Sequence, residues 1–273
     1  MMRNFAQSGN VRLSYSVEGD GAESILLLMG LGGRAADWGV DFPSALSRGY
    51  RVIRYDHRGV GGSPAASGGY VLSDMAKDAT AVLDAVGVER AHVIGYSMGG
   101  MISQLIATEH ADRVSRLVLV STHFGGEDTV PPTPRAMQLF DPVQMLSRGR
   151  DAEAIMRFTM DLLTARGFVE RTPKALELMV DNVRAEPTVP AAFMAQMQAI
   201  IGSDRGEIVR RIQKPTLVVH GTEDELVPVG NGHLLHERIA GSRLEILPGV
   251  GHMPMLEAPS EFADAVLRFL SGR

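Results

Sequence analysis

Short apolar segments alternate along this chain with segments of helical periodicity. Residues 11–17 alternate apolar and polar positions, as a half-buried strand does, and five further runs are almost continuously apolar. Continuous apolar runs of this length are typical of parallel strands that are buried on both faces. The predicted strands are Val11–Val17, Ile25–Met29, Arg51–Tyr55, His92–Tyr96, Arg116–Val120 and Thr216–His220, with Leu244–Leu247 as a weaker seventh.

Apolar residues at helical spacing occupy the gaps between these strands. Strands that alternate with helices predict an α/β fold with a parallel sheet. The predicted helices are Ser73–Val86, Met98–His110, Gly232–Ala240 and Ser260–Leu270.

Residues 124–213 break the alternation, because they hold several helical patterns but no convincing strand. We therefore predict an α/β core built from residues 1–123 and 214–273, with a helical cap inserted over residues 124–213. The insertion follows one core strand and leads into the next, so it should lie over the carboxyl edge of the sheet, where α/β proteins bind ligands. Its apolar faces are formed by Ile155, Phe158, Leu162 and Leu163, by Leu176, Met179, Val180 and Val183, and by Phe193, Met197, Ile200 and Ile201.

The composition narrows the class of protein. The chain has 273 residues, of which 45% are apolar and 22% are charged, as in ordinary globular proteins. It has no cysteine, which excludes disulfides, thiolate nucleophiles and cysteine-based zinc sites. The net charge of −5 gives no basic footprint for nucleic acid.

Neither a membrane span nor a secretion signal is predicted. The longest strongly apolar run, residues 25–29, is far shorter than the roughly 20 residues of a membrane helix. Residues 1–21 lack the apolar core and cleavage pattern of a signal peptide. We expect a cytoplasmic protein that acts on a small molecule away from membranes, and the sequence leaves open whether it forms a homo-oligomer.

The most specific motif is Gly95-Tyr96-Ser97-Met98-Gly99, which matches G-x-S-x-G between a predicted strand and a predicted helix. A serine on such a tight turn is lifted out of the sheet, and the flanking glycines permit the close backbone approach that the turn requires. The start of the helix also favours negative charge that develops beside the serine. Ser97 is therefore the candidate nucleophile.

A serine hydroxyl needs a base to take its proton. His252 lies in a glycine-rich loop between the last predicted strand and the last helix, and it is the candidate base. His220 ends a strand and should be a hydrogen-bonded core residue, whereas His123 should either line the pocket or act at the junction with the cap. The remaining histidines lie beside core elements, in a turn or on a helix expected to face solvent: His57, His92, His110, His233 and His236.

The base in turn needs a carboxylate that fixes its tautomer. Asp224 follows the strand at residues 216–220 and completes the chain order Ser97, Asp224, His252, which is the order expected for a nucleophile on a strand-turn-helix elbow. The competing carboxylates are Glu223, Glu225 and Asp128, the last within the cap.

Acyl transfer also needs two N–H donors for the developing oxyanion. The backbone N–H of Met98 is the first candidate. The glycine-rich segment after residues 25–29 should supply the second from Leu31, with Gly32 as the alternative. The residues expected to contact substrate are Gly30, Gly32, Tyr96, His123 and Met253.

A second glycine-rich loop, Asp56–Ser63, follows another predicted strand. A dinucleotide-binding fingerprint would open a helix, whereas here the loop continues. We interpret it as a structural loop in which Asp56 and Arg58 hold neighbouring turns.

Five segments carry a family resemblance: LLLMGLGG, RYDHRGVGGS, HVIGYSMGGMISQLIATEHADRV, KPTLVVHGTEDELVP and LPGVGHMPMLEAP. Together they resemble the α/β-hydrolase superfamily, over the whole chain except most of residues 124–213. The resemblance implies an eight-stranded, mostly parallel sheet with helices on both faces, a helical cap over a Ser-His-Asp site, and neither a metal nor an organic cofactor. It is specific for the fold and the triad, but not for the substrate.

Two details narrow this resemblance. Met29-Gly30 stands where many members have His-Gly, and with Arg54–Arg58 it is similar to polyketide methylesterases, while the Ser97 loop is also similar to 3-oxoadipate enol-lactonases. The hypothesis is therefore a serine hydrolase that cleaves a carboxylic ester or lactone through an acyl-enzyme. Alternatives on the same residues are a C–C bond hydrolase and a cofactor-free perhydrolase. A third alternative is a ligand receptor with vestigial turnover, although a complete triad argues against it.

Methionine is unusually frequent, with 15 residues. Flexible thioethers around a site would form an adaptable apolar pocket, which favours a bulky apolar substrate. Core filling is the preferred interpretation for Met101 and Met179. Seven methionines lie in the cap (Met137, Met145, Met156, Met160, Met179, Met194, Met197) and five beside the catalytic loops (Met29, Met98, Met101, Met253, Met255).

Overall fold

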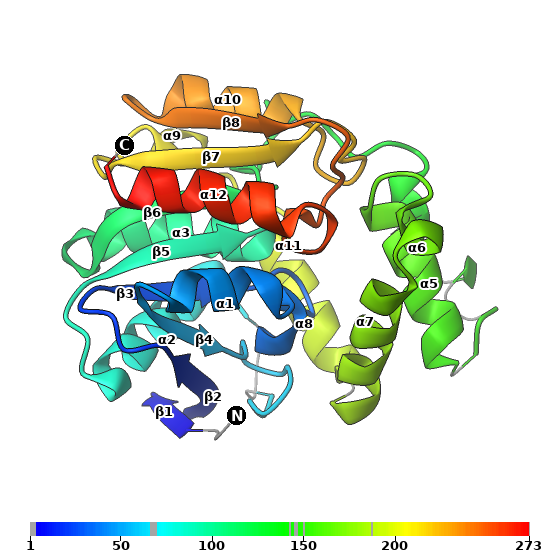
Figure 1. Cartoon of the computed structure of the whole chain (residues 1–273), viewed down its shortest axis with the longest axis horizontal. Coiled ribbons are helices and arrows are strands. Elements are labelled where there is room, and N and C mark those ends of the chain that lie inside the picture. Colours follow the sequence, from blue (N-terminus) through cyan, green and yellow to red (C-terminus); the bar gives the residue numbers. More distant parts are fainter. Residues whose placement is uncertain are drawn as a thin grey trace.

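An eight-stranded sheet crosses the molecule, with its strands in the order β1-β2-β4-β3-β5-β6-β7-β8 (Figure 1). The computed structural model describes residues 4–65, 70–141, 143–144, 147–149, 151–186 and 188–272. Only the pairs β1–β2 and β2–β4 are antiparallel, so the predicted parallel sheet is confirmed. The strands are β1 (Asn4–Ser8), β2 (Val11–Glu18), β3 (Ser24–Leu28), β4 (Arg51–Tyr55), β5 (Ala91–Tyr96), β6 (Val114–Val120), β7 (Thr216–Gly221) and β8 (Arg243–Leu247).

Helices cover both faces of the sheet. Successive side chains of a strand point to opposite faces, so Leu26 and Leu28 of β3 join one core cluster with α2 and α3, while Ile25 and Leu27 join the other with α1 and α12. These helices are α1 (Asp41–Ser47), α2 (Leu72–Val86), α3 (Met98–Glu109), α10 (Gly230–Arg238), α11 (Pro254–Glu257) and α12 (Pro259–Leu270).

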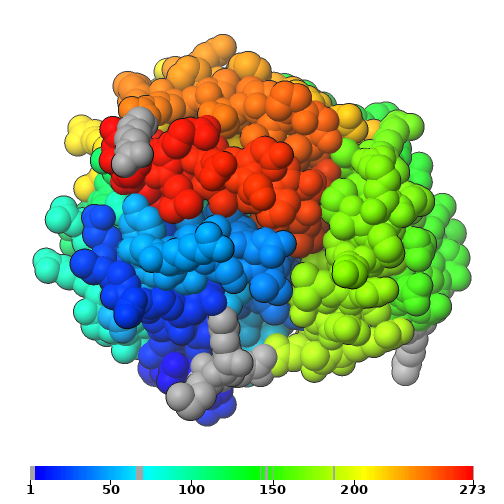
Figure 2. Space-filling view, in the orientation of Figure 1, coloured from blue at the N-terminus to red at the C-terminus, as the bar shows by residue number. Residues whose placement is uncertain are grey.

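The part of residues 124–213 that the structure describes holds helices and no strand, and α5 to α8 lie beyond the carboxyl ends of the parallel strands (Figure 1). We keep the name cap segment for residues 124–213; its separation as a domain stays a prediction. Figure 2 shows this green segment directly against the red C-terminal segment. Its helices are η3 (Ala136–Phe140), α5 (Ala152–Leu163), α6 (Phe168–Arg171), α7 (Pro173–Ala185), α8 (Pro190–Ile200) and α9 (Gly206–Val209).

The cap segment is continuous with both core clusters. Residues of α5, α6 and α7 belong to the same buried cluster as α1 and α12. Ala199 of α8 and Val209 of α9 belong to the opposite one, and α9 packs on α3 and α10. Among the described residues, no helix has both the length and the apolar character needed to cross a bilayer.

Candidate active site

Ser97 lies on the tight turn between β5 and α3. Its backbone has φ 53° and ψ −119°, a conformation that L-residues other than glycine rarely adopt. Two contacts hold it there: the Ser97 N–H donates to the Val120 carbonyl at 2.9 Å, and the Thr122 hydroxyl donates to the Ser97 carbonyl at 2.7 Å. The strained turn leaves the Ser97 side chain half-buried, at the carboxyl edge of the sheet.

The glycines on either side of Ser97 are required by close backbone approach. A methyl group at Gly99 would lie 2.1 Å from the Leu28 carbonyl oxygen, and one at Gly95 would lie 2.3 Å from the Gly99 carbonyl oxygen. Gly30 meets the same turn from the other side, where a methyl group would lie 3.1 Å from the Ser97 Cβ. The loop after β3 is therefore packed directly against Ser97.

Ser97, His252 and Asp224 form one hydrogen-bonded chain. His252 Nε2 lies 3.2 Å from Ser97 Oγ, and His252 Nδ1 lies 2.7 Å from Asp224 Oδ2. The side chains of His252 and Asp224 are buried, whereas Ser97 is partly open to solvent. The structure thus brings together the three residues that the sequence singles out, from three loops far apart in the chain.

Asp224 is held as a carboxylate by its surroundings. Its other oxygen accepts from the N–H groups of Leu226 at 3.0 Å and Val227 at 2.8 Å. Burial by itself would raise the pKa of Asp224, but the adjacent His252 and hydrogen bonds from His220 and His252 outweigh it, so the pKa is lowered. An ionised Asp224 can orient His252 and stabilise its protonated form.

A carboxylate outside the predicted site organises the loop that carries His252. Glu257 of α11 accepts from the N–H groups of Gly251 at 2.8 Å and Met253 at 2.9 Å, on either side of His252. Its Oε2 also accepts from Ala165 in the cap segment at 2.8 Å. Burial raises the pKa of Glu257, although these N–H groups counteract the shift. No pattern in the sequence distinguished it from an exposed helix glutamate.

One predicted oxyanion donor, Met98, directly follows Ser97, and the other, Leu31, directly follows Gly30, which packs against Ser97. Within the described residues, neither the Leu31 N–H nor the Met98 N–H has a hydrogen-bond acceptor in the protein. The N–H of Gly32 instead donates to Gln196 Oε1 of α8 at 2.9 Å. The alternative donor Gly32 is therefore already occupied, because a cap residue that the sequence did not mark takes its hydrogen bond.

The other predicted contact residues differ in exposure. Tyr96 is buried, with its ring 6.2 Å from Trp38 and 5.0 Å from His252, and burial raises its pKa well above the usual value. Met253 is packed into the core cluster. His123 is half-buried, and its Nδ1 accepts from the Gly125 N–H at 3.0 Å. Burial, with Arg205 and His252 nearby, lowers the pKa of His123 to about 4.

The competing acid residues are engaged elsewhere. Asp128 is exposed and pairs with Arg238 at 2.5 Å, and Glu223 is exposed. Glu225 pairs with Arg135 at 3.4 Å and Arg166 at 3.2 Å. His252 therefore contacts only Asp224 among the four carboxylates considered.

The predicted core histidine is found at His220. It is fully buried, and its Nε2 donates to the Val227 carbonyl at 2.7 Å while lying 3.5 Å from Asp224 Oδ2. His220 thus supports the same carboxylate that orients His252.

The glycine-rich loop after β4 has the structural role expected of it. Asp56 accepts from the N–H groups of Ala35 and Gly62, at 2.8 and 2.9 Å. Arg58 makes two hydrogen bonds of 2.7 Å to Asp78 of α2, so it holds a helix rather than a turn.

The methionines of the cap segment are divided between core and surface. Met156, Met160 and Met179 are buried in the core cluster, whereas Met137 and Met194 are exposed. Met197 is half-buried, and Met145 lies outside the described residues. The five beside the catalytic loops are all buried. Core filling therefore accounts for most of these residues.

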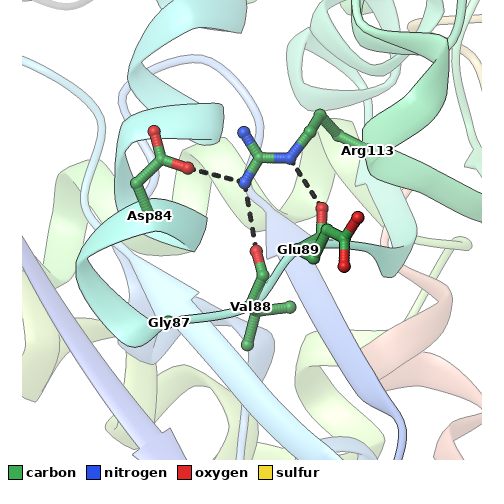
Figure 3. A pocket seen from close by; sticks show the side chains of 5 residues that line it. All are labelled: Asp84, Gly87, Val88, Glu89 and Arg113. Atoms are coloured by element: carbon green, nitrogen blue, oxygen red, sulfur yellow. Dashed lines mark hydrogen bonds and ion pairs between the residues drawn. The ribbon is translucent and has the colours of Figure 1, made fainter.

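A surface pocket opens at the opposite edge of the sheet, where β5 and β6 begin (Figure 3). There the Arg113 guanidinium donates to the Asp84 carboxylate at 2.7 Å and to the carbonyl oxygens of Val88 and Glu89 at 3.0 and 2.6 Å. Because these groups satisfy one another, the pocket has a structural explanation. Among the described residues, no group of three or more His, Cys, Asp or Glu side chains could hold a metal ion.

Fold and site together define an α/β hydrolase. Residues 23–259 match the family described as alpha/beta hydrolase fold, and the chain belongs to that family. The resemblance drawn from the sequence motifs is thereby confirmed.

Similar proteins include hydrolases of several kinds. The chain is 32% identical over 272 residues to a protein of Caulobacter sp. (strain K31) named "Putative carbamate hydrolase RutD", covering 97% of this chain and 98% of that protein. The esterase RhEst1 from Rhodococcus sp. ECU1013 has a TM-score of 0.85 and 30% identity, with 99% of each chain covered. The enol-lactonase from Burkholderia xenovorans LB400 has a TM-score of 0.83 and 27% identity, covering 98% of this chain and all of that one. These similarities support a hydrolase.

Proposed function

We propose that this protein is a serine hydrolase that cleaves a carboxylic ester or lactone of a fairly apolar small molecule. The observation that carries the proposal is the hydrogen-bonded chain from Asp224 through His252 to Ser97, next to two N–H groups that have no acceptor in the described part of the chain. The likeness to an esterase and an enol-lactonase supports the same reaction class.

The reaction begins when Ser97 Oγ attacks the substrate carbonyl carbon and His252 Nε2 takes its proton over the 3.2 Å hydrogen bond. Asp224 holds the Nδ1–H of His252 and stabilises the imidazolium. The N–H groups of Met98 and Leu31 stabilise the tetrahedral oxyanion. His252 then protonates the leaving oxygen, and water, activated by the same histidine, releases the acid from the acyl-enzyme.

The proposed preference for an apolar substrate rests on side chains that remain partly accessible near the loop after β3, which carries Leu31. Leu31 is half-buried in the loop after β3, and Phe193 is half-buried on α8. The ring of Phe193 lies against Gly32, where a methyl group would come within 2.9 Å of it. An acyl or alcohol group of similar polarity would pack against these residues.

The decisive experiment is hydrolysis of p-nitrophenyl esters by the wild type and by Ser97→Ala. We expect the substitution to lower kcat by about 10⁴-fold or more while circular dichroism stays unchanged. Ser44→Ala is the matched control, because Ser44 is exposed on α1. Ester hydrolysis retained by Ser97→Ala would refute the assignment.

A substrate panel separates ester cleavage from related reactions. It should contain esters of increasing acyl length, lactones, aryl carbamates and a β-diketone, each assayed with wild type and Ser97→Ala. The carbamates enter because of the name that the Caulobacter relative carries. Faster Ser97-dependent cleavage of the diketone than of any ester would favour a C–C bond hydrolase, and faster cleavage of acetates than of bulky apolar esters would refute the apolar preference.

A further inference from the structure

Both polar backbone groups of Gly32, the residue after Leu31, are held by the cap segment. Its N–H donates to Gln196 Oε1 at 2.9 Å, and its carbonyl accepts from the Thr188 hydroxyl at 3.0 Å. Gln196 lies 164 positions away from Gly32 in the sequence, so this hydrogen bond joins the cap segment to the core and is not part of a local turn. The cap segment is therefore hydrogen-bonded to the backbone of the loop that carries a candidate oxyanion donor.

The geometry of this loop links Gly32 to the Leu31 N–H. The Gly33 N–H donates to the Gly30 carbonyl at 3.1 Å, which closes a turn with Leu31 and Gly32 as its central residues. Gly32 has φ 66°, the positive value that a type II turn has at its second central residue. The Leu31 N–H belongs to the planar Gly30–Leu31 peptide unit, whose carbonyl accepts the hydrogen bond from Gly33. Gln196 and Thr188 hold the other two peptide units of the same turn, through the Gly32 N–H and the Gly32 carbonyl, and so limit rotation of the Leu31 N–H.

Gln196 joins two core loops through one side chain. It is fully buried on α8, and its Nε2 donates to the Arg58 carbonyl at 3.1 Å, in the loop after β4. Burying an amide is unfavourable unless its groups are hydrogen-bonded, and here both the oxygen and the nitrogen have partners in the core. The buried side chain of Gln196 thus connects the two loops by hydrogen bonds, and it is these loops rather than its own helix that it stabilises.

The cap segment makes further hydrogen bonds along the same loop. Arg34 donates to the Thr188 hydroxyl at 3.1 Å and to the Glu186 carbonyl at 2.5 Å. Asn182 of α7 donates to Asp37 at 2.9 Å. Residues 182, 186, 188 and 196 therefore hold residues 32–37 at several points, and of these Gly32 is the closest in the chain to Gly30, which packs against Ser97.

We infer that Gln196 is a positioning residue for the oxyanion site. By holding Gly32 it orients the Leu31 N–H toward the position where the oxyanion forms, so the site is complete only while α8 is seated on the core. This inference rests on the proposed acyl transfer. It predicts an effect on transition-state stabilisation rather than on substrate binding.

The test compares Gln196→Ala with Gln198→Ala, an exposed glutamine two residues further along α8. With a p-nitrophenyl ester, Gln196→Ala should lower kcat by about 10-fold to 100-fold with KM unchanged, because the donor is displaced and not removed. A boronic acid, which forms a tetrahedral adduct on Ser97, should lose affinity by the same factor, whereas the carboxylate product should bind as before. Gln198→Ala should match the wild type in all three measurements.

A second pair of variants keeps the test independent of how well Gln196→Ala folds. Thr188 is half-buried, so Thr188→Val should fold and lose only the hydroxyl, which donates to Gly32 and accepts from Arg34. It should lower kcat and boronate affinity together, by less than Gln196→Ala because Gln196 still holds the N–H. Thr188→Ser, which keeps the donor, should restore both.

Labelling with a fluorophosphonate separates the two proposals. If wild type is labelled at Ser97 and hydrolyses esters, but Gln196→Ala and Thr188→Val keep the kcat and boronate affinity of Gln198→Ala, the positioning role is overturned and the serine hydrolase stands. A loss confined to KM would likewise overturn it and assign Gln196 to substrate contact. If wild type is neither labelled nor active on any ester, lactone or carbamate, both proposals fail.

Discussion

Three backbone N–H groups around His252 converge on the carboxylate of Glu257. A carboxylate can accept all three, whereas an amide turns one N–H₂ group toward an N–H donor and leaves that donor unpaired. Glu257→Gln should therefore lower the free energy of unfolding by about 1–3 kcal/mol and reduce kcat through a looser His252.

Urea denaturation and ester kinetics measure these two effects for Glu257→Gln. Glu261→Gln on α12 is the matched control, because Glu261 is exposed. Equal stability and kcat in the two variants would show that Glu257 does not organise the loop.

His57 should make the protein less stable as the pH falls. Its Nε2 donates to the Met29 carbonyl at 3.0 Å, and its buried Nδ1 has no partner among the residues that the structure describes, so a second proton would be buried there without an acceptor. Burial lowers the pKa of His57 to about 4 from the ordinary 6.5. The unfolded chain binds the proton first, so stability present above pH about 6.5 is lost progressively down to pH about 4, by up to about 3 kcal/mol.

Denaturation midpoints measured at steps of about 0.5 pH units between pH 7 and pH 4 test this dependence. His57→Gln keeps an N–H donor but cannot titrate, so its stability should fall less steeply, with the remaining slope due in part to His123, whose pKa is also lowered to about 4. His233→Gln, at an exposed histidine, should keep the wild-type slope. Parallel slopes in all three proteins would contradict the assignment to His57.

Sequence patterns located the three candidate catalytic residues better than the residues that hold them in place. Ser97, Asp224 and His252 each follow a strand within a distinctive motif, and the structure brings them within hydrogen-bonding distance. Gln196 and Glu257 carry no such signal, because a buried glutamine and a helix glutamate differ from their exposed counterparts only in what the fold places against them. Their partners lie in other loops, which no local pattern reveals.

At the level of elements, the turn between β5 and α3 depends on glycines more than on any side chain. Gly99→Ala would place a methyl group 2.1 Å from the Leu28 carbonyl, in backbone that cannot move without displacing β3. We expect a loss of at least about 2 kcal/mol in the free energy of unfolding. Gly49→Ala is the control, because among the described residues beyond its two chain neighbours no atom lies within 4 Å of the added methyl group, and it should change stability by less than about 1 kcal/mol. Thermal denaturation that gave similar losses for the two variants would refute the packing argument.

Elements with strong periodicity match their predicted bounds closely, and the weaker strand at residues 244–247 corresponds to β8, but β1 and α1 carry too little pattern to be predicted. The predicted strand at residues 51–55 has the observed bounds of β4. Strand β1 was not predicted, because it is an edge strand in which Ala6 is the buried residue, and its antiparallel pairing with β2 comes from the sheet rather than from its own pattern. Helix α1 was also missed, since its seven residues include Pro43 and span too few turns to show a period.

At the scale of the whole molecule, the cap segment shares its buried side chains with the sheet. Met160, Leu176 and Val180 belong to the cluster that also holds Met29, Trp38 and the helices α1 and α12. Across the sheet, Ala199 of α8 belongs to the other cluster. Separating the cap segment from the core would therefore expose apolar surface on both sides of the sheet, which favours unfolding in one cooperative step.

Two probes in one molecule can measure this cooperativity. Trp38 is the one tryptophan in the chain, and it is fully buried, stacked on Phe42 at 5.6 Å and edge-on to Tyr96. The chain has no cysteine, so Glu177→Cys places a unique thiol for an environment-sensitive dye on the exposed side of α7. In urea, the dye signal and the Trp38 fluorescence should follow the same transition. The same dye at Glu261→Cys, on α12, is the control for effects of labelling. The cap segment would be shown to unfold on its own if the dye transition at Glu177→Cys preceded that of Trp38 while the dye at Glu261→Cys coincided with it. In that case the hydrogen bond between Gly32 and Gln196 would break, and the Leu31 N–H would lose its support, while Ser97, His252 and Asp224 were still in place.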